Sequence, residues 1–130
     1  MNAKNWDDTL HLLCMMILVD GKVFEEEVEA FKDAAIALKD IVNPKLMLTR
    51  HMAGDWFALH RDDIAIRVSP VFYDSSLSGI LKSLDTAENK KELIFALLKV
   101  AMSDGRKHIS EQKLLFSACA AWNLDVDLAS

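Results

Sequence analysis

The sequence predicts an all-α protein, a bundle of about six to seven helices, and three observations support this prediction. Helix-favouring Leu, Ala and Lys are among the commonest residues, whereas Gly and Pro number only 4 and 2. Apolar residues recur at spacings of three and four along most of the chain. The β-branched residues do not cluster in the alternating runs that are typical of strands.

Length and composition indicate one folded domain over residues 1–130. The chain is 52% apolar and 27% charged, so it is too apolar for a disordered protein and large enough to bury a core. No linker, charge run or low-complexity tract divides it. The formal net charge of −5 argues against nucleic acid as a partner, because phosphate binding rests on basic patches.

The first predicted helix covers residues 6–19. Asn5 or Asp7 caps it, and Asp7 and Asp8 lie in its first turn, where the helix dipole favours negative charge. Nearly all of its sides are apolar, which is typical of a central, buried helix. Asp20-Gly21 ends it, since Gly tolerates the left-handed conformation that commonly terminates a helix.

The second predicted helix covers residues 25–41. Asn43-Pro44 stops it and starts the next helix, with the proline in the first turn of that helix. Residues 45–68 then look helical but interrupted, because Gly54-Asp55 would bend or split the helix. The inward stripe of the second helix consists of Val28, Phe31, Ala35 and Leu38, and that of residues 45–68 of Leu48, Met52, Trp56 and Leu59.

Ser69-Pro70 is the next predicted boundary, and three more helices follow it, over residues 71–84, 87–102 and 109–122. Asn123 is expected to cap the last one. The core residues expected of these helices are Phe72, Leu77, Ile80, Leu81, Leu84, Leu93, Ile94, Leu97, Leu98, Ala101, Leu114, Leu115, Ala118, Cys119 and Trp122.

The chain contains an internal repeat. Asp20-Gly21-Lys22 follows one apolar run and Asp104-Gly105-Arg106 follows another, and in each copy a glutamate, Glu27 or Glu111, stands seven positions after the aspartate. A second apolar helix follows each copy. The repeat predicts two pseudo-symmetric helix–(Asp-Gly)–helix halves, whose loops would lie near each other.

This pattern resembles the tellurite-resistance TerB family and its TerB-like relatives, which include the cytoplasmic domain of a membrane-anchored DnaJ-like co-chaperone. The resemblance covers nearly the whole chain. Residues 120–124, Ala-Ala-Trp-Asn-Leu, are similar to the closing helix of the family, and residues 56–64 are similar to middle segments of some members. One departure is that Lys107 and His108 replace Val23 and Phe24 in the second copy.

The resemblance implies an all-helical fold and a non-enzymatic, cytoplasmic role in bacterial stress response or tellurite resistance. It implies a protein or membrane-associated complex as the partner. It also implies a divalent cation at the acidic loops, and the positions that match the proposed ligands are Asp20, Glu27, Asp104 and Glu111.

The four acidic residues also have a structural interpretation, and both interpretations stay open. Each glutamate falls near the third position of a helix, where its side chain can accept from an amide of the first turn, as in a capping box. As ligands, their oxygens suit Ca²⁺, Mg²⁺ or Mn²⁺. Neither loop has the ligand spacing of an EF-hand.

Two alternative functions belong to other classes. One is a metal-dependent hydrolase in which the acidic loops hold the metal and His108 acts as acid or base. The other is a purely structural domain that forms a homo-oligomer. No Gly-rich phosphate loop, nucleophile elbow or HExxH motif is present, so an enzyme is not the favoured interpretation.

The two cysteines, His11 and the methionines are expected in the core rather than in a functional site. Cys14 and Cys119 fall in apolar helical patterns and are expected to be buried, free thiols in a reducing, cytoplasmic setting. His11 is expected to be partly buried, and the methionines, Met15 and Met16 among them, are expected to fill the core. The longest apolar run, residues 12–19, is too short to span a bilayer, so an integral membrane protein is not expected.

Overall fold

The computed structural model describes residues 3–19, 25–42, 44–69, 71–84, 90–103 and 109–123, with the side chains of residues 3–5, 42 and 109–111 excepted. These residues form a compact all-α bundle, and within them there are six helices and no strands. The helices are α1 (Ala3–Leu18), α2 (Glu25–Val42), α3 (Arg50–Arg67), α4 (Tyr73–Leu84), α5 (Lys90–Ala101) and α6 (Ile109–Ala121).

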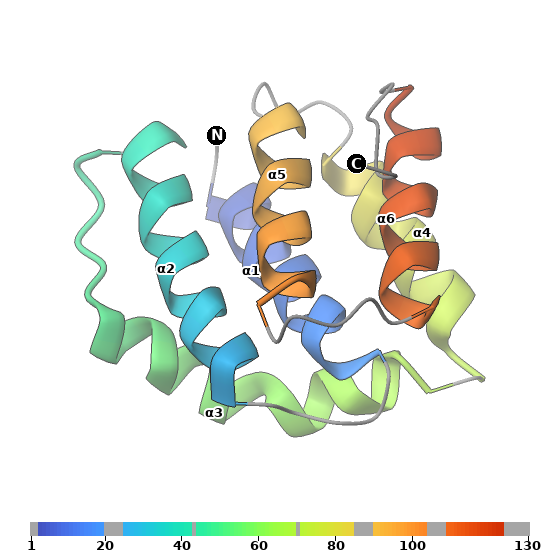
Figure 1. The fold of residues 1–130 in the computed structure, drawn as a ribbon, viewed down its shortest axis with the longest axis horizontal. Coiled ribbons are helices and arrows are strands. Elements are labelled where there is room, and N and C mark those ends of the chain that lie inside the picture. The colour runs from blue at the N-terminus through green and yellow to red at the C-terminus, as the bar shows by residue number, and fades with distance from the viewer. Residues whose placement is uncertain are drawn as a thin grey trace.

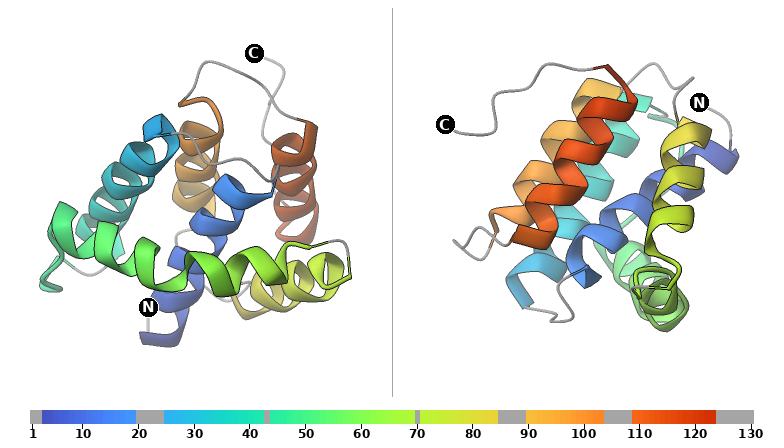
Figure 2. Two further views of the ribbon diagram at one scale, coloured as in Figure 1. Left: turned by 90° about the horizontal axis from the view of Figure 1, so that it is seen from below. Right: turned by 90° about the vertical axis from the view of Figure 1, so that its right-hand side faces the viewer.

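The helices form two layers with α1 at the centre. α2, α5 and α6 lie side by side in one layer, α1 and α4 lie behind them, and α3 crosses one end of the bundle (Figures 1 and 2). α1 contacts all five of the other helices. α2 and α5 run antiparallel, so the start of α2 lies near the end of α5 (Figure 1).

The central position of α1 confirms the prediction from its apolar sequence. Every side chain from Thr9 to Leu18 is buried. The predicted start is wrong, because Ala3 and Lys4 favour helix and extend α1 by about one turn. Asp7 and Asp8 therefore lie beyond the first turn, where Asp8 accepts a hydrogen bond from the Ser83 hydroxyl of α4.

α2 matches its prediction, but the segment after it does not. Phe31, Ala35 and Leu38 are buried, and Val28 packs against the core as expected. The expectation that Pro44 lies in the first turn of the next helix is wrong, since α3 begins only at Arg50. Thr49 caps α3, because its hydroxyl oxygen accepts a hydrogen bond from the Met52 amide at 3.1 Å.

α3 is one continuous helix, so the predicted bend at Gly54-Asp55 is wrong. Gly54 lies against α2, where an added Cβ would be 3.0 Å from the Cε atom of Lys32. The glycine thus allows close helix packing and does not break the helix. The predicted boundary at Ser69-Pro70 agrees with the end of α3 at Arg67.

The predicted inward stripe of residues 45–68 is confirmed only in part. Leu48 and Trp56 pack against the core, as predicted. Met52 and Leu59 are 43% and 77% exposed, whereas Ala53, Phe57 and Ile64 are buried. Ala53 and Phe57 each follow a predicted position by one residue, a rotation of about 100° about the helix axis. Both rows are apolar, so the periodicity alone did not show that Ala53 and Phe57 face the core beside Trp56.

The last three helices agree closely with the predictions, with two exceptions. Leu98 is only partly buried, although it packs against the core. Phe72 precedes α4 and is 49% exposed, so its predicted core position is wrong. Asn123 adopts a φ of 54° directly after the last turn of α6, which confirms its role as the C-terminal cap. The core side chains confirmed in these helices are Leu77, Ile80, Leu81, Leu84, Leu93, Ile94, Leu97, Ala101, Leu114, Leu115, Ala118, Cys119 and Trp122.

Both Asp-Gly turns of the repeat, within residues 20–24 and 104–108, lie outside the described residues. The two-fold relation between the halves of the chain therefore stays a prediction. None of the described helices combines the length and hydrophobicity needed to cross a lipid bilayer.

Candidate functional site

The four predicted cation ligands are described only in part. Asp20 and Asp104 lie outside the described residues, and so does the side chain of Glu111, although this residue belongs to α6. Glu27 is the third residue of α2 and is fully buried. Its position in the helix agrees with the capping interpretation. Within the described part of the chain, no three His, Cys, Asp or Glu side chains form a group that could hold a metal ion.

An acidic hollow lies beside the first turns of α2, next to the end of α5. Its volume is about 460 Å³. It is lined by Glu25, Glu26, Glu29, Ala30, Asp33 and Ser103. Acidic side chains at this end of α2 stabilise the helix, because they complement the partial positive charge of its N-terminus.

Two of the four carboxylates in the acidic hollow have basic partners. Arg50 of α3 forms ion pairs with both Glu29 and Asp33. The Nζ atom of Lys32 lies 3.3 Å from the Oε1 atom of Glu29, and this hydrogen bond lowers the pKa of Glu29, with a further contribution from Arg50. Glu25 and Glu26 are exposed, and neither forms an ion pair with another described residue.

A second concave surface, which we name the α2–α5 groove, continues from the acidic hollow. It has a volume of about 500 Å³. Its apolar lining comes from Ala34, Ala37, Leu38, Ile41, Phe95, Ala96, Leu98 and Met102, and its charged lining from Asp33, Glu92 and Lys99. Asp33 lines both the groove and the hollow, so the two surfaces are contiguous.

The groove is formed by small, buried side chains and is bordered by large, exposed ones. Ala34 and Ala96 are buried and allow the surface to be hollowed between α2 and α5. Ile41, Phe95 and Met102 are large but remain 51%, 51% and 40% exposed. Large apolar side chains gathered on one exposed surface are typical of a binding site for an apolar partner.

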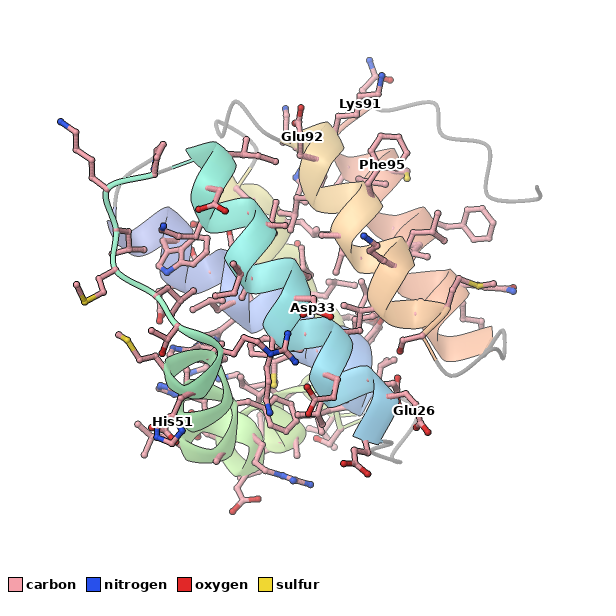
Figure 3. All side chains as sticks on the ribbon, turned by 60° about the vertical axis from the view of Figure 1, so that its left-hand side comes forward. Glu26, Asp33, His51, Lys91, Glu92 and Phe95 are labelled. Carbon is pink, nitrogen blue, oxygen red and sulfur yellow. The ribbon has the colours of Figure 1, made fainter. Side chains whose placement is uncertain are left out.

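Figure 3 shows how the charged residues are distributed along this surface. Glu26 lies at the start of α2 and Asp33 lies further along it, while Glu92 and Phe95 lie toward the opposite end, on α5. Lys91 adjoins Glu92 at that opposite end. The surface is therefore acidic at the end with Glu26 and carries both signs of charge at the end with Glu92.

The sequence patterns do not predict the groove. Ile41 and Met102 fall at the ends of predicted helices, and Phe95 lies outside the predicted apolar stripes. The available signal was that Phe95 lies outside the stripe of Leu93 and Leu97, on a helix that already had enough core residues. The methionine prediction holds for Met15 and Met16, which are buried, and is wrong for Met47, Met52 and Met102, which are exposed.

A histidine cluster joins α1 and α3. The His11 ring lies 5.3 Å from the Trp56 ring and 5.9 Å from the His60 ring, measured between centroids. Burial lowers the pKa of His11. Asp7 acts in the opposite direction, and its Oδ2 atom lies 3.7 Å from the Nε2 atom of His11. His11 is 8% exposed, so it is buried more fully than the predicted partial burial.

The two cysteines are buried and free, as predicted. Burial raises the pKa of the Cys14 thiol to about 12 and raises that of Cys119 in the same direction. Because the thiolate is the reactive form, neither residue is suited to act as a nucleophile near neutral pH.

The acidic hollow and the α2–α5 groove together are the strongest candidate site among the described residues. Comparisons of the chain with protein-family models, with curated proteins and with solved structures find no match.

Proposed function

We propose that this protein is a non-enzymatic binding module that holds a helical segment of another protein in the α2–α5 groove. The observation that carries this proposal is the set of exposed apolar side chains, Ile41, Phe95 and Met102, around one groove. The resemblance to TerB-like proteins, with a cytoplasmic role in stress response or tellurite resistance, belongs to the same proposal, as do the two pseudo-symmetric halves.

A helix is the occupant that fits the shape of the groove. Two antiparallel helices form its walls, and a third helix packs well along such a pair by inserting its side chains between theirs. α1 lies behind both walls, so a bound helix would complete a four-helix arrangement with α1, α2 and α5. From Glu92 to Met102 the groove runs for about 15 Å, which accommodates roughly three helical turns.

The test of this proposal uses a designed helical peptide with leucines along one face and uncharged polar residues elsewhere. Titration of this peptide into the isotopically labelled protein should shift the NMR signals of α2 and α5 selectively. Amide signals that move mainly in α3 and α4, or no change at millimolar peptide, would contradict the proposal.

A pair of matched variants locates the binding surface. Phe95 lines the groove, whereas Phe116 is an equally exposed phenylalanine of α6 that does not line it. We expect Phe95→Asp to weaken peptide binding by about tenfold or more, because an aromatic anchor is worth roughly 2 kcal/mol. Phe116→Asp should leave the affinity within about twofold of the parent value.

A divalent cation at the Asp-Gly loops is a second candidate function, favoured by the complete burial of Glu27, whose chain neighbours Glu25 and Glu26 line the acidic hollow. Carboxylate oxygens suit Ca²⁺, Mg²⁺ or Mn²⁺, and the expected ligands are Asp20, Glu27, Asp104 and Glu111. We expect one of these cations, added after EDTA, to raise the melting temperature, since binding to the folded state alone stabilises it. An unchanged melting temperature with all three cations would exclude this function.

A further inference from the structure

The two ends of the α2–α5 groove differ in charge. At the end next to the acidic hollow, Glu25 and Glu26 are exposed without an ion pair to any described residue. Arg50 faces the two other carboxylates of that end, Glu29 and Asp33. At the opposite end Glu92 adjoins Lys91, so that end carries both signs of charge (Figure 3).

We propose that the helix bound in the α2–α5 groove carries lysine or arginine residues at one end, and that this end lies over the acidic hollow. The proposal rests on the proposed function and deepens it by stating the chemistry and the orientation of the partner. The partner is thus an amphipathic, cationic-ended helix, with its apolar face toward Phe95, Ile41 and Met102.

The geometry allows one helix to reach both surfaces. Because Asp33 lines the groove and the hollow, a segment that follows the groove past Asp33 arrives at Glu25 and Glu26. From Glu25 to Ile41 the surface of α2 extends for about 24 Å, the length of a helix of about 16 residues. The apolar part of such a helix would occupy the groove, and its last one or two turns would cover the hollow.

The electrostatics favour a cationic end in two ways. The net charge of −5 attracts a cationic segment over long range and raises its association rate. After docking, the apolar part of the partner excludes water beside the hollow, which strengthens the attraction between its basic side chains and Glu25 and Glu26. Lys99, a cation that lines the groove, lies on α5 and disfavours a partner that is basic along its whole length.

Other occupants fit the charges less well. A second copy of this chain has the same acidic end, so like charges would meet if two copies aligned their grooves in parallel. An anionic membrane surface or a nucleic acid would be repelled by the acidic hollow. These occupants are separate outcomes of the experiment described next.

The experiment compares designed helical peptides of 16 residues on the full-length protein in EDTA, with fluorescence anisotropy as the readout. All peptides share one leucine face, and one end carries three lysines or three glutamates, in separate peptides for the N- and C-terminal positions. At low ionic strength we expect the better lysine peptide to bind about tenfold more tightly than the matched glutamate peptide. The difference should shrink in 0.5 M salt, because exposed charges are then screened.

Charge variants assign the preference to the acidic hollow. Glu25→Lys with Glu26→Lys should abolish or reverse the preference for lysine, and Glu25→Gln with Glu26→Gln should reduce it by about half on a logarithmic scale. The control is Asp62→Lys with Asp63→Lys on α3, which makes the same change of charge at exposed residues that line neither surface. Circular dichroism melting identifies any variant that fails to fold, and the glutamine variant is retained in that case.

The outcomes separate the two proposals. Equal affinity for the lysine and glutamate peptides, or a preference that survives both hollow variants, overturns the cationic partner while leaving the groove intact. No binding of any peptide, including the uncharged one, overturns the proposed function itself. A dimer in sedimentation that Phe95→Asp dissociates makes a second copy the occupant, and binding to anionic vesicles makes it a membrane; either result overturns the proposal.

Discussion

α1 and the α2–α5 groove are both built from apolar side chains, but only α1 is enclosed by other helices. Five helices contact α1, and its side chains from Thr9 to Leu18 are all buried. α5 has a similarly apolar sequence, yet its Phe95 remains exposed beside α2, as does Met102 directly after the helix. The difference shows that the neighbours of a helix, and not its residue types alone, decide which apolar side chains are available to a partner.

Truncation of one large side chain in each region gives the largest expected effect. Leu13→Ala should lower the free energy of unfolding by about 2–5 kcal/mol, because Leu13 is 0% exposed and its removal leaves a cavity. Phe95→Ala should lower it by about 1 kcal/mol or less, since half of that side chain is already in solvent. Urea denaturation of both variants measures the contrast, and equal losses would mean that the groove is part of the core.

Variants of Glu27 measure how much this buried residue of α2 contributes to the free energy of unfolding. Glu27→Ala should lower the free energy of unfolding by about 1–3 kcal/mol, because it removes the interactions of a fully buried side chain. Glu27→Gln should cost less, since glutamine also serves in a capping box. The control is Glu26→Gln, which makes the same substitution at an exposed position of α2.

The response of Glu27→Gln to cations separates the two interpretations of this residue. If Glu27 is a ligand, the glutamine variant should lose the rise in melting temperature that Ca²⁺, Mg²⁺ or Mn²⁺ produces in the parent protein. If Glu27 is only a cap, the variant and the parent protein should respond to these cations in the same way.

The glycines extend the comparison of open and enclosed positions to the backbone of two helices. Gly79 of α4 is exposed, and an added Cβ would have no neighbour within 4 Å. We expect Gly79→Ala to stabilise the protein by about 0.5–1 kcal/mol, because alanine restricts the unfolded chain more than glycine does. Gly54→Ala should stabilise less, since the new methyl group must displace the end of the Lys32 side chain. Thermal melting compares both variants, and an equal gain would show that α2 and α3 are loosely packed.

The smallest expected effect is the pH dependence that comes from His11. Burial lowers the pKa of His11 below its ordinary 6.5, with Arg67 and His60 acting in the same direction and Asp7 and Asp8 against it. The folded state therefore binds a proton less readily than the unfolded state. The stability contributed by neutral His11 is complete above pH 6.5 and is lost as the pH falls from 6.5 through the lowered pKa.

Melting between pH 8 and 5 checks this sign. The parent protein should lose stability relative to His11→Phe as the pH decreases, because the phenylalanine keeps the contact with Trp56 but does not titrate. The control is His51→Gln on α3, whose side chain is 87% exposed. A parent protein that gains stability on acidification relative to His11→Phe would contradict the burial of a neutral imidazole.

The helices were predictable where one apolar stripe was clearly dominant. Phe31, Ala35 and Leu38 of α2 were identified from spacing alone, because charged residues such as Lys32, Asp33 and Lys39 mark the opposite side of that helix. In α3 two neighbouring stripes are apolar, and only the packing against α1 and α2 selects Ala53, Phe57 and Ile64.

The candidate site was less predictable than the fold. The repeat and the family resemblance predict Asp20, Glu27, Asp104 and Glu111 as cation ligands. This interpretation remains a prediction. The groove combines Ile41 of α2 with Phe95 of α5 and with Met102, which follows α5. Both Phe95 and Met102 are more than fifty positions from Ile41 in the sequence. A local pattern gives no information about such a pairing, because it depends on which helices become neighbours.

The sequence by itself determined that this protein is helical, which helix is central and that both cysteines are buried. These properties follow from the local spacing of apolar residues and from the cost of placing them in water. The tertiary structure alone decided that Gly54 is a packing contact, that α3 presents Ala53 and Phe57 to the core, and that Phe95 borders an open groove. These properties depend on how helices cover one another, and a helix that lacks a neighbour keeps an apolar face for a partner.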